Sequence, residues 1–158
     1  MQGNPRIITA LNDVLASKLT AINQLYLHGR MGINWGFHRL GGKTTKQSIT
    51  VMKHASTLTD RILLLEGLPN MQKLHALNIG EDVEEQLRND LQMAINGVEN
   101  LRKSINNCTE HHDHGSREML EQILVDDEEY LDWLEEQLDL LLKVGKSNYL
   151  ATQLEAVS

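Results

Sequence analysis

Two pairs of side chains spaced three residues apart are the first candidates for chemistry in this sequence. They are Val51 with His54 and Asp127 with Tyr130, and each pair lies near the middle of a segment with helical periodicity. Helical bundles that bind two metal ions place Glu-x-x-His at this spacing on two helices and add one Glu from each of the other two. The residue spacing of such a site is therefore present, but one or both metal ligands of each pair are replaced by other residues.

The midpoints of the other two helical segments are Lys18 and Ala94. Four carboxylates without a metal would repel one another in a low-dielectric core, whereas one lysine and one aspartate nearly cancel in charge. We therefore predict a buried ion pair between Lys18 and Asp127, with His54 and Tyr130 sharing the remaining hydrogen bonds. The alternative is that Lys18 extends its ammonium to water along a channel.

The segments that must position these residues are identified by apolar spacing and by helix-breaking residues. We expect helices at residues 6–35, 44–66, 81–107 and 116–144, and a short tail helix at residues 148–154. The first helix is expected to end where His38-Arg39-Leu40-Gly41-Gly42 interrupts the pattern, and residues 71–80 are expected to form a long connection. Two short links around one long crossover predict an all-α, ferritin-like four-helix bundle.

The chain has 158 residues, a single cysteine and a formal net charge of -7. This length suits one domain, residues 1–158, with its own hydrophobic core. Cys108 cannot form an internal disulfide, and the N-terminal residues lack the apolar stretch of a signal peptide, so we expect a cytoplasmic protein. The negative charge argues against a nucleic-acid partner, and no membrane partner is expected.

Short motifs spread over nearly the whole chain carry a family resemblance. They include Ala21-Ile22-Asn23-Gln24, Asn34-Trp35-Gly36, Met52-Lys53-His54-Ala55, Leu65-Glu66-Gly67-Leu68-Pro69-Asn70 and Asp132-Trp133-Leu134-Glu135. Together these motifs resemble the bacterioferritins. The resemblance implies a four-helix bundle with a short fifth helix, assembled into a 24-subunit octahedral shell that stores iron as a ferric mineral.

The resemblance also implies where a di-iron ferroxidase centre would lie. Its six ligand positions fall at Lys18, Val51, His54, Ala94, Asp127 and Tyr130, where the family has Glu, Glu, His, Glu, Glu and His. Only His54 matches the family, and Asp127 is a shortened carboxylate. We therefore expect no di-iron centre and no catalytic residue, with His54 and Asp127 left as weak remnants of the metal site.

Met52 is the second site residue that the resemblance singles out. A helix methionine taken alone is usually packing material, although helical spacing places Met52 off the stripe that faces the interior. In bacterioferritins the methionine at this position and its copy on a two-fold-related subunit ligate the iron of haem b, which suits electron transfer. The remaining residues of the implied haem pocket are Leu19, Ile22, Asn23, Tyr26, Ile49 and Lys53.

Two further surfaces are weaker candidates. The resemblance implies a docking surface for a small iron-sulfur ferredoxin from Leu68-Pro69-Asn70 through Leu77, Glu81 and Glu85, and the alternative is a solvated crossover loop. The segment from Cys108 to His114 is rich in metal ligands, but consecutive histidines in a turn cannot all converge on one ion. We interpret that segment mainly as a polar interhelical loop.

The sequence thus favours a haem-bearing iron-storage subunit that lacks its own ferroxidase centre and co-assembles with a ferroxidase-competent companion. A first alternative is iron oxidation at a non-standard site, such as His54 with Asp127 and water, or the histidine-rich loop. A second alternative is a haem-binding redox relay whose shell holds no mineral.

Overall fold

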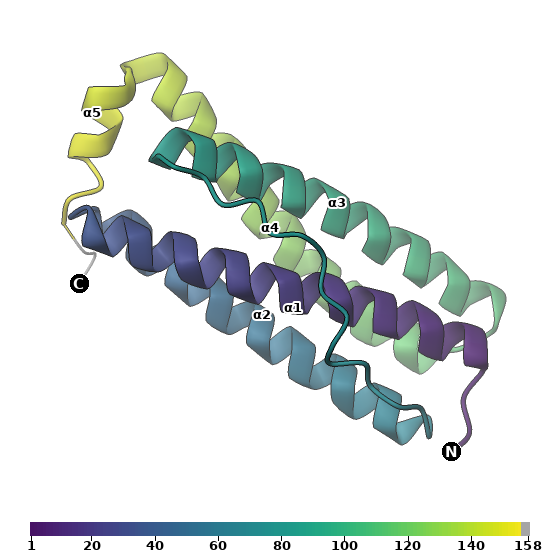
Figure 1. The fold of residues 1–158 in the computed structure, drawn as a ribbon. Helices are drawn as coiled ribbons and strands as arrows, with labels where there is room; N and C mark the ends of the chain where they lie inside the picture. Colours follow the sequence, from purple (N-terminus) through teal and green to yellow (C-terminus); the bar gives the residue numbers. More distant parts are fainter. Residues whose placement is uncertain (156–158) are drawn as a thin grey trace.

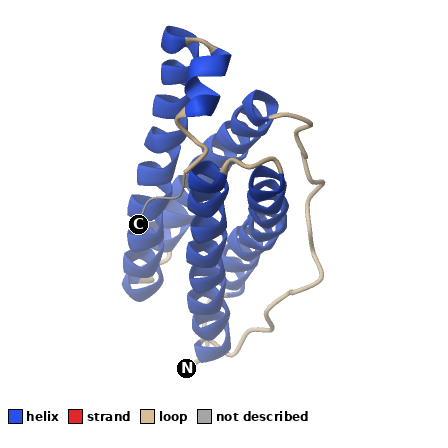
Figure 2. Cartoon of the chain, turned by 90° about the vertical axis from the view of Figure 1, so that its left-hand side faces the viewer, coloured by secondary structure: helices blue, strands red, loops and turns tan. Residues whose placement is uncertain are grey.

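The structure, a computed structural model, describes residues 1–155 of the chain. Its helices are α1 (Pro5–Asn34), α2 (His38–Leu64), α3 (Val83–Glu110), α4 (His114–Val144) and α5 (Lys146–Ala151). The first four form one bundle in which α1 packs along α2 and α3 packs along α4 (Figure 1). Residues 65–82 form the crossover, which runs along the outside of the bundle (Figure 2). The predicted all-α bundle with one long crossover and a short fifth helix is confirmed, and residues 156–158 of the predicted domain lie outside the described part.

Helix boundaries follow from capping side chains. Asn4 precedes Pro5 and accepts a hydrogen bond from the Arg6 amide at 2.8 Å, and proline suits the first turn because its missing N–H is not needed there. Asp82 caps α3 through the Glu85 amide at 2.9 Å, and Asp113 caps α4. These caps satisfy amides that have no partner within their own helices.

The start of α2 differs from the prediction, because α2 begins at His38 instead of residue 44. The chain turns at Gly36, whose φ of 89° suits glycine, and Gly41 lies inside the helix. A Cβ on Gly41 would lie 2.8 Å from the Ile33 nitrogen and 2.9 Å from the Gly29 oxygen of α1. Gly41 therefore allows two helices to approach closely and does not break one.

The hydrophobic core is divided into two clusters. One cluster is formed by residues such as Leu11, Leu58 and Leu120, and the other by residues such as Leu25 and Leu134. Each fully buried leucine contributes about 1.5–3 kcal/mol to folding. Lys18 and Asp127 lie between the two clusters along their helices, so the middle of the bundle is its polar part.

The crossover is tied to the bundle by side chains of α1. Thr20 accepts a hydrogen bond from the His75 amide at 2.9 Å, and Gln24 accepts one from the Asn78 amide at 3.0 Å. The backbone amides and carbonyls of a loop need such side-chain partners, because no helix or sheet supplies hydrogen bonds to them. The crossover is thereby held over the middle of α1. None of the helices that the structure describes is both long and apolar enough to cross a membrane.

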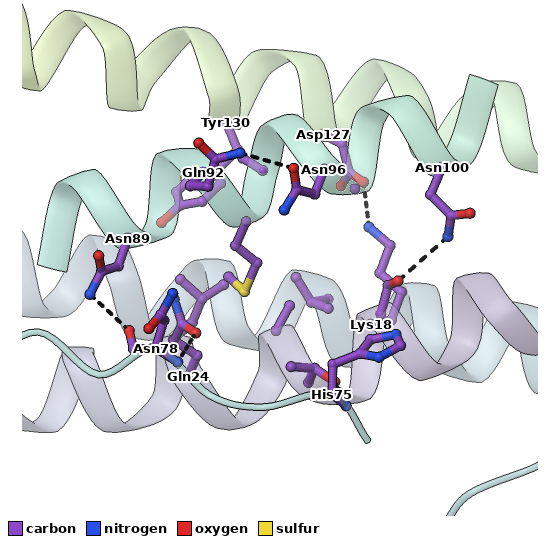
Figure 3. Close-up of a pocket in the computed structure, with 18 of the residues that line it drawn as sticks. Lys18, Gln24, His75, Asn78, Asn89, Gln92, Asn96, Asn100, Asp127 and Tyr130 are labelled. Atoms are coloured by element: carbon purple, nitrogen blue, oxygen red, sulfur yellow. Dashed lines mark hydrogen bonds and ion pairs between the residues drawn. The ribbon is translucent and has the colours of Figure 1, made fainter. Parts of the chain in front are cut away.

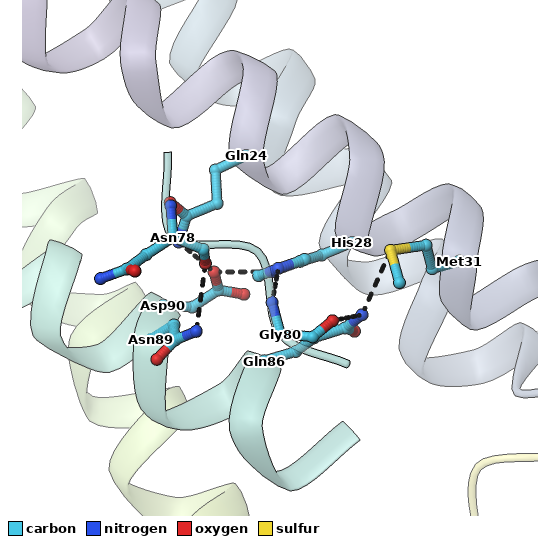
Figure 4. A network of polar contacts seen from close by, with 8 residues as sticks. All are labelled: Gln24, His28, Met31, Asn78, Gly80, Gln86, Asn89 and Asp90. Carbon is cyan, nitrogen blue, oxygen red and sulfur yellow. Dashed lines mark hydrogen bonds and ion pairs between the residues drawn. The ribbon is translucent and has the colours of Figure 1, made fainter. Parts of the chain in front are cut away.

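A second set of contacts holds the end of the crossover (Figure 4). The Gly80 amide donates to His28 Nε2 at 3.0 Å, and His28 Nδ1 contacts the Asp90 carboxylate at 2.8 Å. Because Nε2 accepts from an amide, Nδ1 must carry the proton and His28 is neutral. Gln24 donates to the same Asp90 oxygen at 2.9 Å, so α1, α3 and the crossover meet in one buried network.

Candidate functional site

Five of the six positions singled out at the bundle midpoints line a single cavity of about 310 Å³ (Figure 3). These five residues are Lys18, Val51, Ala94, Asp127 and Tyr130. All four long helices contribute to the wall, and the crossover adds His75, Ala76 and Asn78. The sixth position, His54, lies beside the cavity, with its Nδ1 3.8 Å from an Asp127 oxygen. The structure therefore brings together the residues that helical spacing predicted to meet.

The predicted ion pair between Lys18 and Asp127 is present at the centre of the bundle. Lys18 Nζ lies 2.5 Å from Asp127 Oδ2, and the two side chains are only 8% and 12% exposed. Desolvation by burial lowers the pKa of Lys18, while the charge of Asp127 and the hydrogen bond between them raise it. The ammonium is buried against its partner, so the alternative of a lysine extended into water is wrong.

The predicted sharing of the remaining hydrogen bonds is wrong for both His54 and Tyr130. His54 Nε2 pairs instead with Asp126 Oδ2 at 2.8 Å, and no partner within hydrogen-bond distance of His54 Nδ1 was found among the described residues. The buried Tyr130 hydroxyl also lacks a partner in that part of the chain, and its ring stacks on that of Trp133 with the centroids 5.7 Å apart.

Asp126 is the functional residue that the sequence reasoning missed. Its side chain is 51% exposed, so it reaches the buried imidazole of His54 from the surface. Desolvation lowers the pKa of His54, the nearby Lys18 ammonium lowers it further, and Asp126 and Asp127 oppose both effects. The adjacent aspartates in the sequence were the available signal, because neighbouring helix positions point about 100° apart and can serve two different partners.

The donor set at the centre is poor in metal ligands. Val51 and Ala94 carry no donor atom, and Lys18 adds a cation beside Asp127, the one carboxylate among the six positions. Within residues 1–155, no group of three or more His, Cys, Asp or Glu side chains that could hold a metal ion is found. These residues do not fit a pair of iron ions, which would need carboxylates at several of these positions.

Met52 lies on the outer side of α2 and is 42% exposed, as its helical position predicted. The six residues named with it lie on α1 and α2, and none of them is fully buried: Leu19, Ile22, Asn23, Tyr26, Ile49 and Lys53. Tyr26 and Ile49 are each about half exposed, so a thioether sulfur and apolar side chains share one surface. Such a surface suits a flat apolar cofactor or a second protein chain.

The crossover surface is exposed and apolar at several points. Leu68 is 83% exposed and Leu77 is 44% exposed, with Glu81 and Glu85 exposed beyond them. Pro69 is half-buried and Asn70 accepts hydrogen bonds from the amides that follow it. Exposed leucines along the crossover and exposed carboxylates at its end suit a partner protein with an apolar patch and basic neighbours.

The segment from Cys108 to His114 spans the end of α3, an interhelical turn at residues 111–113 and the first residue of α4, so the predicted loop is shorter than the segment. Cys108 is fully buried, and burial raises the pKa of its thiol to about 11. Asp113 is held by Arg61 at 3.0 Å and by Ser116, and His111 bonds to a backbone oxygen of its own helix. These ligand types therefore do not converge on one point.

Comparison with known proteins agrees with the architecture and with the sequence motifs. The family of Ferritin-like domains matches residues 8–144. The bacterioferritin BfrA of Mycobacterium tuberculosis is 45% identical over 151 residues, which cover 96% of this chain and 95% of its own. The bacterioferritin of Streptomyces coelicolor is 43% identical over 155 residues (98% and 93% of the two chains), and that of Brucella melitensis is 40% identical over 149 residues (94% and 92%). The chain belongs to the bacterioferritin family of ferritin-like proteins.

Proposed function

We propose that this chain is a haem-binding subunit of a cytoplasmic iron-storage shell that lacks its own di-iron ferroxidase centre. The observation that carries this proposal is the buried ion pair between Lys18 and Asp127. The Lys18 ammonium would occupy the space where iron ions place their charge, and it is paired with Asp127, the one carboxylate among the six midpoint residues. Metal binding would require breaking this pair and leaving two cations side by side in a low-dielectric core.

Membership of the family supports the storage part of the proposal. Ferritin-like subunits assemble into closed symmetric shells, and the apolar side chains exposed on this bundle suit burial between subunits. A subunit that cannot oxidise Fe(II) needs the oxidised iron to come from elsewhere in the same shell. We therefore infer that this chain co-assembles with a ferroxidase-competent bacterioferritin subunit.

The haem part of the proposal rests on the surface around Met52. The exposed thioether and the half-exposed Tyr26 and Ile49 fit one face of haem b, and a two-fold-related copy would supply the other face. Lys53 would reach the propionate groups as a cation. Met52 and its copy would hold the haem iron through their thioether sulfurs, and the haem would supply electron transfer toward the stored mineral.

The exposed crossover is the proposed entry point for electrons. Leu68 and Leu77 would form the apolar centre of a docking surface, and Glu81 and Glu85 would form an acidic edge. A small iron-sulfur ferredoxin with a complementary surface is the proposed partner. Its binding should weaken as salt is added, because the edge contacts are between exposed charges.

Stopped-flow measurement of Fe(II) oxidation by the purified chain alone tests the missing centre. We expect a rate equal to that of protein-free solution. A variant carrying Lys18→Glu, Val51→Glu, Ala94→Glu, Asp127→Glu and Tyr130→His should gain a fast saturable phase, whereas Lys18→Glu alone should not. A fast phase in the unchanged chain that disappears in His54→Ala would contradict the proposal and favour oxidation at a non-standard site.

Haem absorbance of the purified shells tests the role of Met52. We expect one haem for every two chains, and its loss in Met52→Leu. Met71→Leu is the matched control, because Met71 is also exposed but lies on the crossover. Haem retention by Met52→Leu would contradict the assigned ligand, and shells isolated from cells with haem but without iron would favour a redox relay over storage.

A further inference from the structure

Lys18 is the one lysine that lines the cavity at the bundle centre, and its amine is a potential nucleophile. Its side chain is only 8% exposed, whereas every other lysine of the chain is exposed. Lysines desolvated in apolar pockets are the ones that form covalent bonds with carbonyl compounds in proteins. The cavity volume of about 310 Å³ lies at the lower end of the roughly 300–1,000 Å³ range typical of small-molecule sites.

The Lys18 ammonium has hydrogens to spare after it has bonded to Asp127. Figure 3 shows Lys18 extending from α1 toward Asp127 on α4, and Nζ donates to Asp127 Oδ2 at 2.5 Å. An ammonium carries three donors, and Asp127 is the one hydrogen-bond partner of Nζ among residues 1–155. The remaining donors are thus available to a polar atom of a molecule in the cavity that Lys18 lines.

Asp127 is placed to act as the base that makes this amine reactive. An amine attacks only after it has lost a proton, and a general base must lie within hydrogen-bond reach of that proton. Asp127 is in direct contact with Nζ and lines the same cavity. Desolvation by burial lowers the pKa of Lys18, so its neutral amine is more accessible than that of an exposed lysine.

The lining favours a small uncharged molecule. Lys18 and Asp127 are its one lysine and its one carboxylate in the described structure, and they neutralise each other in a direct ion pair. A charged molecule would enter a low-dielectric space with no counter-ion available to it. Val51, Ala94 and Leu101 are apolar parts of the wall and suit a short hydrocarbon chain. An aldehyde fits best, because its carbonyl carbon is less hindered than that of a ketone.

We propose that Lys18 forms a reversible imine with a small uncharged aldehyde bound in this cavity. Asp127 accepts a proton from Nζ, the freed lone pair forms a bond to the carbonyl carbon, and the carbonyl oxygen leaves as water with two hydrogens of the original ammonium. The imine nitrogen keeps the third hydrogen and the positive charge, so Asp127 retains a cationic partner. The step requires no oxidant, reductant, iron or haem, and it is independent of the function proposed above.

Gly97 of α3 provides a way to close the cavity without changing Lys18 or Asp127. It lines the cavity, and a Cβ at this position would meet no atom within 4 Å. The variant Gly97→Leu therefore projects a side chain into open space, and replacing a helical glycine favours the helix. Gly42→Leu is the matched control, because Gly42 is also helical with open space at its Cβ but does not line the cavity.

The test treats the assembled protein, free of haem and iron, with butanal and dimethylamine–borane, an uncharged reductant that traps an imine as a stable secondary amine. Peptide mass spectrometry then gives the rate of labelling at each lysine. Near neutral pH we expect Lys18 to be labelled at least about tenfold faster than Lys103, an exposed lysine of α3, which corresponds to one unit of pKa. In the chain unfolded by urea, the two lysines should be labelled at equal rates.

Two further comparisons separate the cavity from the lysine itself. Gly97→Leu should prevent labelling of Lys18 and leave that of Lys103 unchanged, whereas Gly42→Leu should preserve both; circular dichroism and elution volume establish that each variant is folded and assembled. Glyoxylate, an anionic aldehyde, should label Lys18 no faster than Lys103. The proposal is overturned if butanal labels Lys18 no faster than Lys103 in the unchanged protein, if Gly97→Leu is labelled at Lys18 as fast as the unchanged protein, or if glyoxylate shows the same preference for Lys18 as butanal.

Discussion

Two buried polar regions of this bundle differ in how completely their groups are paired. Around Asp90, both nitrogens of His28 have partners, and Gln24 donates to the same carboxylate while its own oxygen accepts from the crossover. Around Lys18 and Asp127, the hydroxyl of Tyr130 and the Nδ1 of His54 have no partner in the described part of the chain. Full pairing is what a structural network requires, since unpaired buried groups are unfavourable.

The comparison indicates that the two regions contribute differently to the stability of the fold. The network around Asp90 joins α1, α3 and the crossover, and its contacts have sequence separations of more than fifty residues. It therefore fixes the tertiary structure. The centre leaves two buried groups unpaired beside a cavity, so we expect it to contribute less to stability than the Asp90 network.

Removing the Asp90 carboxylate should have the largest effect on stability. In Asp90→Ala, Gln24 and His28 each lose a hydrogen bond to a carboxylate, and such bonds contribute roughly 1.5–3 kcal/mol each. We expect the free energy of unfolding in urea to fall by about 3–6 kcal/mol. Asp90→Asn retains one acceptor and should lose less; equal losses in the two variants would show that the carboxylate is not the anchor of the network.

Replacing the central ion pair as a whole should be tolerated. In the double variant Lys18→Met/Asp127→Leu, the lost attraction is offset because two charges no longer need to be desolvated. We expect the free energy of unfolding to stay the same or to rise by about 1–4 kcal/mol, whereas either single change should destabilise the protein. A large loss of stability in the double variant would mean that this pair supports the fold as the Asp90 network does.

A pair of tyrosines tests the same comparison at single hydroxyl groups. Tyr149 is fully buried and donates to Gln137 at 2.7 Å, whereas the Tyr130 hydroxyl is buried without a partner in the described chain. Tyr149→Phe should lower the free energy of unfolding by about 1 kcal/mol, and Tyr130→Phe should leave it unchanged or raise it slightly. Equal losses in urea denaturation would show that the Tyr130 hydroxyl is satisfied in solution.

Apolar spacing was enough to predict the bundle, because four amphipathic helices with one long link have few ways to pack. The start of α2 was predicted too late since Gly41 reads as a helix breaker in the sequence. Its role in close packing depends on the backbone of α1 facing it. Information of that kind belongs to the pair of helices and not to either segment alone.

At the centre of the bundle, the contact that follows from charge balance could be predicted from the sequence. The contacts that depend on side-chain orientation could not. A lysine and an aspartate at the midpoints of an apolar core must compensate each other, so the pair of Lys18 with Asp127 was predictable. The bond from His54 to Asp126 depends on how the side chains of the two adjacent aspartates are oriented around α4, and charge balance does not determine this. The network of His28 with Asp90 joins residues 62 positions apart through the path of the crossover, which periodicity does not determine.

The smallest expected effect is a pH dependence that comes from His54. Its side chain is 7% exposed, and burial together with the Lys18 ammonium lowers its pKa, against the opposing charges of Asp126 and Asp127. The unfolded chain binds a proton near the ordinary histidine pKa of about 6.5 while the folded chain stays unprotonated, so stability rises with pH through this window. This contribution is present above about pH 6.5 and is lost as the pH falls toward the lower folded-state pKa.

Urea midpoints measured from about pH 7.5 to pH 5.5 should therefore fall less steeply in His54→Gln than in the unchanged protein. His38→Gln is the matched control, because it removes a histidine that is exposed at the start of α2. If the slope is unchanged in His54→Gln, the attraction of Asp126 and Asp127 balances the effects of burial and Lys18, and the centre is better paired than its contacts indicate.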